Sequence, residues 1–227
     1  MTNGSSGSAF PFVSGRTRCC LRGFRFVPLV SMKIFVLVAL LLSGVAFAAE
    51  EQKPSTANEV AIIKTTKGEM VVQFWTDASP DTIANFKKLA RSGFYNGTIF
   101  HRIVKGFMIQ GGDPNTKDPA KESSYGEGTA GYRIKGEFND HPHDRGVISM
   151  AREASPDTAS CQFFICLKPV HRLDHQYATF GKLIKGLDVL DKIGDTPTVL
   201  GLDGALSKPT ERVTINSIEI VPADSVK

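Results

Sequence analysis

The first 48 residues of this 227-residue chain contain no acidic residue, although five of its 27 lysines and arginines lie there. The other 179 residues therefore hold 22 basic and 23 acidic side chains, which gives them a net charge of −1. This balance leaves no positive field to attract nucleic acid, so we expect no nucleic-acid partner. With 41% hydrophobic and 22% charged residues, the composition is that of a soluble globular protein and excludes disordered, collagen-like and multi-span membrane chains.

The N-terminal region also lacks an apolar run long enough to span a membrane. Nine apolar residues, Ile34–Leu42, lie within an uncharged stretch of 16 residues that ends at Ala49, whereas a transmembrane helix needs ~20. Lys33 precedes this stretch and the small-residue sequence Ala46-Phe47-Ala48 follows it, which is typical of a secretory signal peptide. A membrane anchor is the alternative interpretation.

We therefore expect residues 1–48 to be an N-terminal extension and a cleavable signal peptide ending near Ala48. The mature protein is then periplasmic or secreted, with no stable membrane insertion after signal cleavage. A signal that began at Met32 would be complete by itself, so residues 1–31 are assigned no fold.

Cysteine is scarce, with four residues in the whole chain. Cys19 and Cys20 would leave with the signal peptide. Cys161 and Cys166 are five residues apart on a predicted strand, so they point to opposite faces and cannot form a disulfide with each other. We expect both to be buried and unpaired. A redox pair or a nucleophilic thiol is the alternative, but the sequence shows no base partnered to either cysteine.

The mature chain is predicted to be mainly β. After a polar lead-in at residues 49–58, one domain covers 59–223, and 224–227 form a C-terminal tail. Segments of strand character alternate with turn residues; they are Val60–Lys64, Met70–Trp75, Thr98–Val104, Phe107–Gly111, Tyr132–Phe138, Gly146–Ala151, Gln162–Leu167, Ala178–Leu183 and Val213–Val221.

Two helices are predicted beside these strands. The first begins at Pro80, with Ser79 as its cap, and ends at Gly93; the second carries Leu187, Leu190 and Ile193 at helical spacing and stops at Gly194. Many short strands and two helices favour a β-barrel or sandwich whose ends the helices cover. The polar stretches 114–131 and 199–208 are predicted to be surface loops.

Two strand segments carry apolar residues on both faces. In FHRIVKGFMIQGGD (residues 100–113), Met108 and Gln110 share one face, and Phe107 and Ile109 share the other. In CQFFIC (residues 161–166), a Gln likewise shares a face with a Phe. A small barrel has one core, so one face of each strand should look outward and offer an apolar patch beside an amide, as a peptide-binding groove does. The alternative is that a helix or loop buries this second face.

The sequence FHRIVKGFMIQGGDP resembles the signature of the cyclophilins, which are barrel-shaped peptidyl-prolyl cis-trans isomerases. The resemblance continues through GVISMA at 146–151, SCQFFIC at 160–166, Leu173-Asp174 and TFGKLIKG at 179–186, and covers about residues 60–221. It implies a closed eight-stranded antiparallel β-barrel capped by two α-helices. It also implies an isomerase that needs no cofactor, holds no metal and acts on proline-containing unfolded or flexible polypeptides; we expect a monomer of the bacterial exported type.

The resemblance assigns the site residue by residue. The catalytic arginine of the family falls on Arg102, and His101 beside it is another site residue. The glutamines that hold the substrate backbone and order the arginine fall on Gln110 and Gln162, and Ala151 is a wall position. The proline pocket falls on four apolar residues, namely Phe107, Met108, Phe164 and Leu173.

The chain departs from many eukaryotic members at two site positions and differs at a third. Arg172 replaces a tryptophan that contributes to cyclosporin binding, Tyr177 replaces a histidine of the site, and Arg152 replaces a small polar residue. The first two changes put drug sensitivity in doubt more than turnover, and the third can alter how the groove holds a peptide.

Two further hypotheses come from other functional classes. One is a non-catalytic chaperone or adaptor that binds proline-containing segments. The other is a metal site at His141, His143 and the neighbouring Asp140 and Asp144, for which no third well-placed ligand is apparent.

Overall fold

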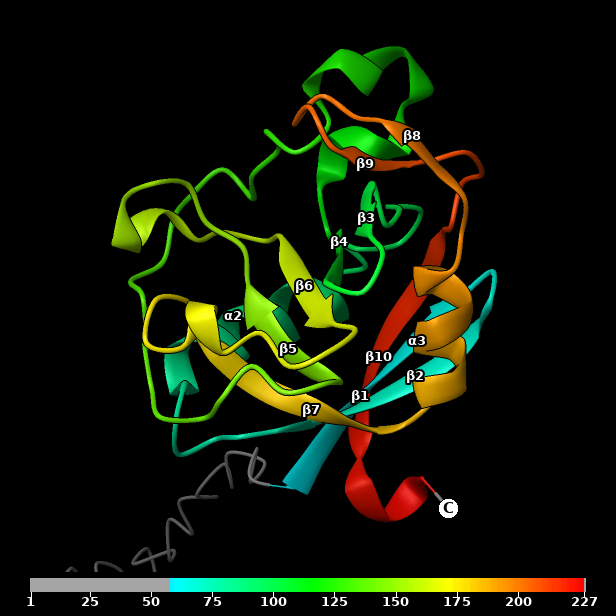
Figure 1. The fold of residues 1–227 in the computed structure, drawn as a ribbon. Coiled ribbons are helices and arrows are strands. Elements are labelled where there is room, and N and C mark those ends of the chain that lie inside the picture. The colour runs from blue at the N-terminus through cyan, green and yellow to red at the C-terminus, as the bar shows by residue number, and fades with distance from the viewer. Residues whose placement is uncertain (1–57, 227) are drawn as a thin grey trace, which may run out of the picture. The chain divides into compact units, whose positions relative to one another are not determined.

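The computed structural model describes residues 58–226. Eight antiparallel strands form one curled sheet in the order β10-β1-β2-β7-β5-β6-β4-β3 (Figure 1). These strands are β1 (Glu59–Thr65), β2 (Gly68–Phe74), β3 (Arg102–Val104), β4 (Met108–Gly111), β5 (Val147–Met150), β6 (Phe163–Cys166), β7 (Thr179–Lys185) and β10 (Ile215–Pro222).

The predicted closed barrel is confirmed only in part: the eight strands form one sheet, but the barrel does not close. The outer strands of the sheet are β10 and β3, and a single bridge between Ile99 and Thr214 connects the segments that precede them. The strand expected over 98–104 is shortened to Arg102–Val104. One reason is that the amide of Ile99 donates to the hydroxyl of Thr116, at 3.1 Å, rather than to a neighbouring strand. The structure therefore shows a curled, half-closed sheet.

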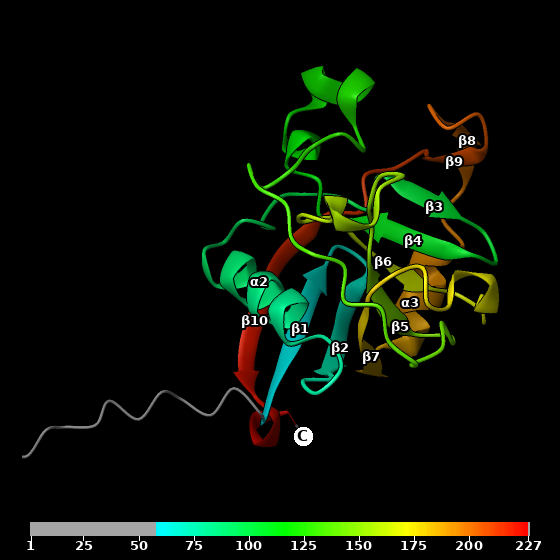
Figure 2. The ribbon, with the colours of Figure 1, turned by 90° about the vertical axis from the view of Figure 1, so that its left-hand side faces the viewer.

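Two α-helices lie on different sides of this sheet, α2 (Pro80–Arg91) and α3 (Leu187–Gly194) (Figures 1 and 2). Both predicted helices are thus confirmed. Most of their apolar residues are buried in the main core, whereas Leu187 at the start of α3 is exposed. Ser79 occupies the N-cap position of α2 before Pro80, as expected, but its side chain does not cap the helix: the Ser79 hydroxyl donates to the carbonyl of Thr179 at 2.8 Å. The carboxylate of Glu137 caps the helix instead, accepting from the amides of Asp81 and Thr82 at 3.1 and 2.7 Å.

The inner face of the sheet supplies a row of isoleucines to the core. Ile103, Ile109, Ile165 and Ile148 lie opposite one another on β3, β4, β6 and β5, and all are fully buried. Because side chains alternate along a strand, the neighbours of these residues must face outward. The two-faced pattern of the sequence therefore places the candidate groove on the outer face of the same four strands.

Three segments differ from their predicted form. Residues 199–208, expected to be a loop, belong to a hairpin of β8 (Thr198–Leu200) and β9 (Leu206–Pro209). Residues 132–138, expected to be a strand, make only one bridge, between Ile134 and Ala159. The loop at 114–131 contains two short 3-10 helices, which are η2 (Pro114–Lys117) and η3 (Pro119–Ser124). Further short turns of this kind are η4 (Pro156–Thr158), η5 (His171–Leu173) and η6 (Ala223–Ser225).

The predicted signal peptide, most of the polar lead-in, and Cys19 and Cys20 lie outside the described residues. Across residues 58–226, the structure contains no helix with the length and apolar character needed to cross a membrane.

Candidate active site

The outward face of the sheet aligns polar and aromatic side chains in one row across four strands. Arg102 on β3 lies opposite Gln110 on β4, which lies opposite Phe164 on β6, and Phe164 lies opposite Ser149 on β5. Strand pairing thus brings together residues that are up to 62 positions apart in the sequence. The local alternation of the two strand segments is sufficient to place Arg102, Gln110 and Phe164 on one surface.

An apolar cluster, separate from the main core, forms the floor and walls of a groove on this surface. Met108 and Phe164 are buried in it, and Phe107, Ala151, Leu173 and Tyr177 pack partly buried against them. A cavity of about 300 Å³ opens here. Its lining consists of Arg102, Phe107, Met108, Gln110, Ala151, Arg152, Phe164, Leu173 and Tyr177. The cavity therefore unites the four predicted proline-pocket residues with Arg102.

Phe107 reaches this cavity because it is not part of a strand. The sequence predicted a strand from Phe107, which would place Phe107 on the same face as Ile109. Instead, Phe107 closes a turn from Val104, with its amide donating to the Val104 carbonyl at 2.9 Å, and β4 begins at Met108. Gly106, in the same turn, has a φ of 71°, a conformation that glycine adopts without strain. Both Phe107 and Met108 consequently face the groove.

The guanidinium of Arg102 lies at the edge of the cavity. Its Nη1 is 3.8 Å from the sulfur of Met108, on the pocket side. Its Nε donates to Oδ2 of Asp203 at 2.6 Å, and the Arg102 side chain is 31% exposed. Asp203 lies in the turn between β8 and β9, within residues 199–208, for which the sequence predicted only a surface loop.

Two glutamine amides form a hydrogen-bonded chain beside the cavity. Gln162 donates from Nε2 to the carbonyls of Gly126 and Gly128 at 2.8 and 2.9 Å, and accepts on Oε1 from Gln110 Nε2 at 3.0 Å. This chain fixes the orientation of both amides, and Gln110 also lines the cavity. The glutamines were expected to order Arg102, but among residues 58–226 their hydrogen bonds go to each other and to loop carbonyls.

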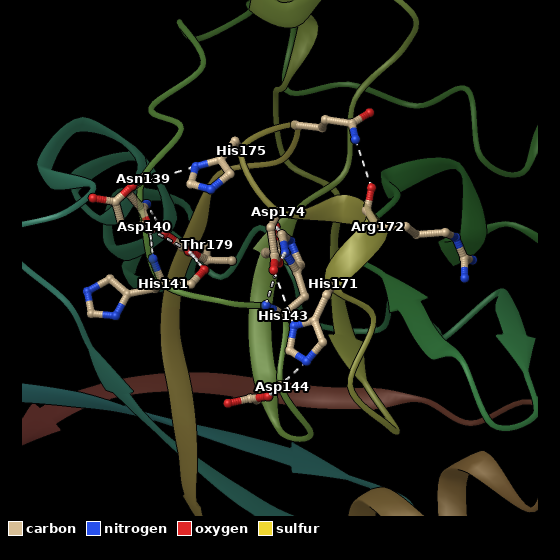
Figure 3. A network of polar contacts seen from close by, with 12 residues as sticks. Asn139, Asp140, His141, His143, Asp144, His171, Arg172, Asp174, His175 and Thr179 are labelled. Carbon is tan, nitrogen blue, oxygen red and sulfur yellow. Dashed lines mark hydrogen bonds and ion pairs between the residues drawn. The ribbon is translucent and has the colours of Figure 1, made fainter.

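A buried histidine supports the pocket from behind. The ring of His143 is fully buried and stacks on Phe164, with ring centroids 5.9 Å apart and planes at 9°. Its Nδ1 lies 2.8 Å from Oδ1 of Asp174 (Figure 3). Its Nε2 lies 3.2 Å from the hydroxyl of Ser149. Burial lowers the pKa of His143 despite the opposing influence of Asp174. The neutral ring can therefore donate to Asp174 and accept from Ser149.

His101 lies beside Arg102 but lines a neighbouring cavity of about 580 Å³, between the β8–β9 hairpin and residues 122–127. Both ring nitrogens are buried, without a hydrogen-bond partner in the described part of the chain. Burial lowers the pKa of His101 to about 4. The negative charge of Asp113 opposes this shift, and the positive charge of Arg102 adds to it. His101 is thus a neutral wall residue at neutral pH.

Comparison with known proteins identifies the family to which this chain belongs. The sequence profile of the cyclophilin type peptidyl-prolyl cis-trans isomerase/CLD family matches residues 60–220. The chain belongs to the cyclophilin family.

Named relatives agree with this assignment. A peptidyl-prolyl cis-trans isomerase of Acinetobacter baylyi is 36% identical over 199 residues, which cover 84% of this chain and 98% of the relative. Another, from Helicobacter pylori, is 43% identical over 150 residues, covering 63% and 84%. The crystal structure of a Cryptosporidium parvum cyclophilin, determined in the presence of the dipeptide Ala-Pro, superposes with a TM-score of 0.63 at 32% identity and covers 71% of this chain and 98% of that one. The 227-residue chain is accordingly a peptidyl-prolyl cis-trans isomerase of the cyclophilin family.

Of the three positions at which this cyclophilin departs from the eukaryotic pattern, Arg152 and Tyr177 line the cavity, and Arg172 packs over the cavity residue Phe107. The guanidinium of Arg172 lies 4.6 Å from the centre of the Phe107 ring, and that of Arg152 lies 4.6 Å from the Tyr177 ring. Arg152 also donates to three backbone carbonyls, at 2.8 to 2.9 Å. Tyr177 packs edge-on against Phe164, with ring centroids 5.7 Å apart. These two arginines therefore give the rim a cationic character.

The residues of the metal hypothesis have other partners in this cyclophilin. His141 stacks on Trp75 with ring centroids 3.9 Å apart, whereas His143 is buried behind Phe164. Within residues 58–226, no group of three or more His, Cys, Asp or Glu side chains is placed to hold a metal ion.

The two cysteines of the described chain are buried and unpaired, as predicted. Cys161 belongs to the main core and Cys166 to the groove cluster, so they lie on opposite faces. Burial raises the pKa of each thiol to about 12, which opposes formation of a nucleophilic thiolate.

Proposed function

We propose that Arg102 is the catalytic residue of this isomerase and that the residues around the cavity hold a proline-containing peptide against it. Rotation about an X-Pro bond is opposed by a barrier of ~20 kcal/mol that comes from amide resonance. No covalent bond has to break, so a site that binds the twisted amide better than either planar form is sufficient. This mechanism requires no cofactor.

The charge of Arg102 suits the twisted amide. Loss of resonance returns a lone pair to the proline nitrogen, which can then accept a hydrogen bond. A guanidinium is a rigid donor that keeps its charge at neutral pH. One charged hydrogen bond supplies ~1.5 to 3 kcal/mol, or about one to two powers of ten in rate. The Nη1 contact with Met108 puts this donor beside the apolar floor, which supports the assignment.

The apolar part of the cavity supplies the remainder through positioning and exclusion of water. We assign the proline ring to the pocket of Phe107, Met108, Phe164 and Leu173. Tyr177 lies edge-on against Phe164 at the rim, and His101 is a neutral wall near Arg102. The side-chain oxygen of Gln110 is assigned to accept from a peptide amide N–H, with the Gln110 amide nitrogen held by Gln162. Ala151 is small and leaves room for the peptide chain at the wall. Together these contacts would hold the proline while the preceding carbonyl rotates.

Substrates of this site are proline-containing segments of unfolded or flexible polypeptides. The cavity is an open groove, which suits an extended polypeptide chain. The related Cryptosporidium parvum structure, obtained in the presence of Ala-Pro, favours the same ligand class.

We further propose that the protein works after export, as a monomer in the periplasm or an equivalent secretory compartment. The support is the sequence of residues 33–48, with its basic start, short apolar stretch and small-residue end. N-terminal sequencing of the protein from the secreted or periplasmic fraction should give a chain beginning near Ala49. Recovery of the uncleaved chain in the cytoplasm alone would contradict export.

The catalytic assignment is tested by comparing three variants in an isomerase assay on a proline tetrapeptide. Arg102→Ala should lower kcat/KM at least ten-fold, with the fold intact. Phe107→Ala should act mainly by raising KM, because it removes one wall of the pocket. Asp191→Asn, which weakens an exposed pair with Arg145 at 2.7 to 2.8 Å, should match the wild type. Unchanged turnover in Arg102→Ala would reject the mechanism.

A further inference from the structure

The turn of the β8–β9 hairpin places a carboxylate on the guanidinium of Arg102. Asp203 Oδ2 accepts from Arg102 Nε at 2.6 Å, and both side chains are partly buried, at 29% and 31% exposed. The hairpin lies beside β3, the strand that carries Arg102 (Figures 1 and 2). A residue about 100 positions away in the sequence thus contacts the proposed catalytic group.

Asp203 is held in place by its own turn and not by Arg102 alone. Its Oδ1 accepts from the hydroxyl of Ser207 at 2.6 Å and from the amide of Ala205 at 3.1 Å. The Gly201 amide closes the turn on the Ala205 carbonyl at 2.8 Å, and a Cβ at Gly201 would collide with the Ser207 hydroxyl. One oxygen of the carboxylate is therefore fixed by the hairpin, and the other is left for Arg102.

Burial opposes ionisation of this carboxyl, but the hydrogen bonds from Ser207 and Arg102 outweigh it and lower the pKa of Asp203 to about 2. The group is thus a carboxylate at any pH at which the enzyme is assayed.

The contact uses one edge of the guanidinium and leaves another toward the pocket. An arginine has five N–H donors in a planar fork, so a carboxylate on Nε fixes the plane without occupying every terminal donor. Nη1 lies on the pocket side, 3.8 Å from the Met108 sulfur. Among residues 58–226, this weak contact is the other hydrogen bond of the guanidinium, because the Gln110 amide is turned to Gln162.

We infer that Asp203 is a positioning residue: its carboxylate fixes Arg102 through Nε so that the terminal nitrogens face the proline pocket. The inference rests on the catalytic role proposed for Arg102. A long flexible side chain without such an anchor would spend part of its time in other rotamers, and a donor that is misplaced in the transition state contributes less to turnover than one already aligned.

The test combines single variants with a double-mutant cycle in the full-length protein. In Asp203→Asn, the amide oxygen can keep the bonds from Ser207 and Ala205, but the NH₂ group then faces the Nε–H donor of Arg102. This variant should lower kcat about 3- to 10-fold and leave KM within about two-fold. In the Arg102→Ala background the same change should have no further effect. Ser207→Ala, which frees the carboxylate from its turn, should give a smaller loss of kcat.

The matched control is Asp191→Asn, which removes the same charge from another Asp–Arg pair, neither member of which lines the groove. Both variants should remain folded at the assay temperature, and the kcat of Asp191→Asn should equal that of the wild type. A spectroscopic signature accompanies the kinetics: the Nε–H resonance of Arg102 should exchange slowly with water in the wild type and rapidly in Asp203→Asn.

The outcomes separate the two proposals. If Arg102→Ala lowers turnover but Asp203→Asn does not, the positioning role is wrong and the catalytic role stands. If Asp203→Asn lowers turnover equally with and without Arg102, the effect is structural and the positioning role is again wrong. If Arg102→Ala leaves turnover unchanged, both proposals fail.

Discussion

Replacement of Asp174 should weaken the proline pocket from behind. Oδ1 of Asp174 accepts two hydrogen bonds from His143, one from the backbone amide and one from Nδ1, both at 2.8 Å. The His143 ring is fully buried against Phe164. In Asp174→Ala, the backbone amide and the ring Nδ1–H of His143 would each lose a hydrogen bond to a charged acceptor. The ring N–H would also be left buried without a partner.

The size of the effect follows from these two bonds. An unsatisfied buried donor costs ~1 to 3 kcal/mol, and a hydrogen bond to a charged group contributes ~1.5 to 3 kcal/mol, so with partial compensation by water Asp174→Ala should lower the free energy of unfolding by ~2 to 4 kcal/mol. Asp174→Asn retains an oxygen at the position of Oδ1 and should cost about 1 kcal/mol. Because Phe164 stacks on His143, we also expect KM for a proline peptide to rise in Asp174→Ala more than in Asp174→Asn.

Urea unfolding of the two variants and an isomerase assay measure these effects. The control is Asp191→Ala, which removes an exposed carboxylate with a single arginine partner. The reasoning would be refuted if Asp174→Ala were as stable as Asp191→Ala, or if Asp174→Asn were as unstable as Asp174→Ala.

Three other predictions concern stability, pH and reactivity. Glu137→Ala should remove the cap of α2 and lower the free energy of unfolding by about 1 to 2 kcal/mol with kcat/KM unchanged; an unaltered urea midpoint would show that the cap is dispensable. Burial lowers the pKa of His101 to about 4 in the folded protein, from an ordinary value of 6.5, so as pH falls from 6.5 to 4 the unfolded chain binds a proton that the folded chain does not. The free energy of unfolding should therefore fall by up to about 3 kcal/mol over that interval, and less in His101→Gln; equal pH slopes would contradict this assignment. Because burial raises the pKa of Cys161 and Cys166 to about 12, a disulfide reagent at pH ~8 should label them only on unfolding, and rapid labelling of the native protein would contradict their burial.

Alternation and helical spacing predicted much of this fold from the sequence. Both helices form as expected, and the two-faced strands around Ile109 and Phe164 do bury one face in the main core and turn the other to the groove. These features depend on short-range periodicity, which one segment of sequence contains by itself.

The remaining features depend on partners that are distant in the sequence. The cap of α2 comes from Glu137 and not from the adjacent Ser79, because the Ser79 hydroxyl is bound to a strand carbonyl. The closure of the sheet depends on whether segments near Ile99 and Thr214 extend their pairing, which no local pattern specifies.

The candidate site shows the same division. The resemblance supplied the pocket residues, but Asp203 lies in a stretch that was predicted to be a loop. The sequence did contain a signal for it, since Asp203-Gly204 between apolar residues is typical of a β-hairpin turn. That signal predicts a hairpin and not its contact with Arg102, because the contact depends on how the hairpin packs beside β3.

The rate of cis/trans exchange on the enzyme, measured by NMR at saturating proline peptide, tests the central claim most directly. Arg102→Ala should bind the peptide with a Kd within about three-fold of the wild type and yet catalyse exchange at least ten-fold more slowly, because the arginine acts on the twisted amide more than on the planar one. Equal exchange rates in the two proteins, or a loss explained entirely by weaker binding, would contradict the account.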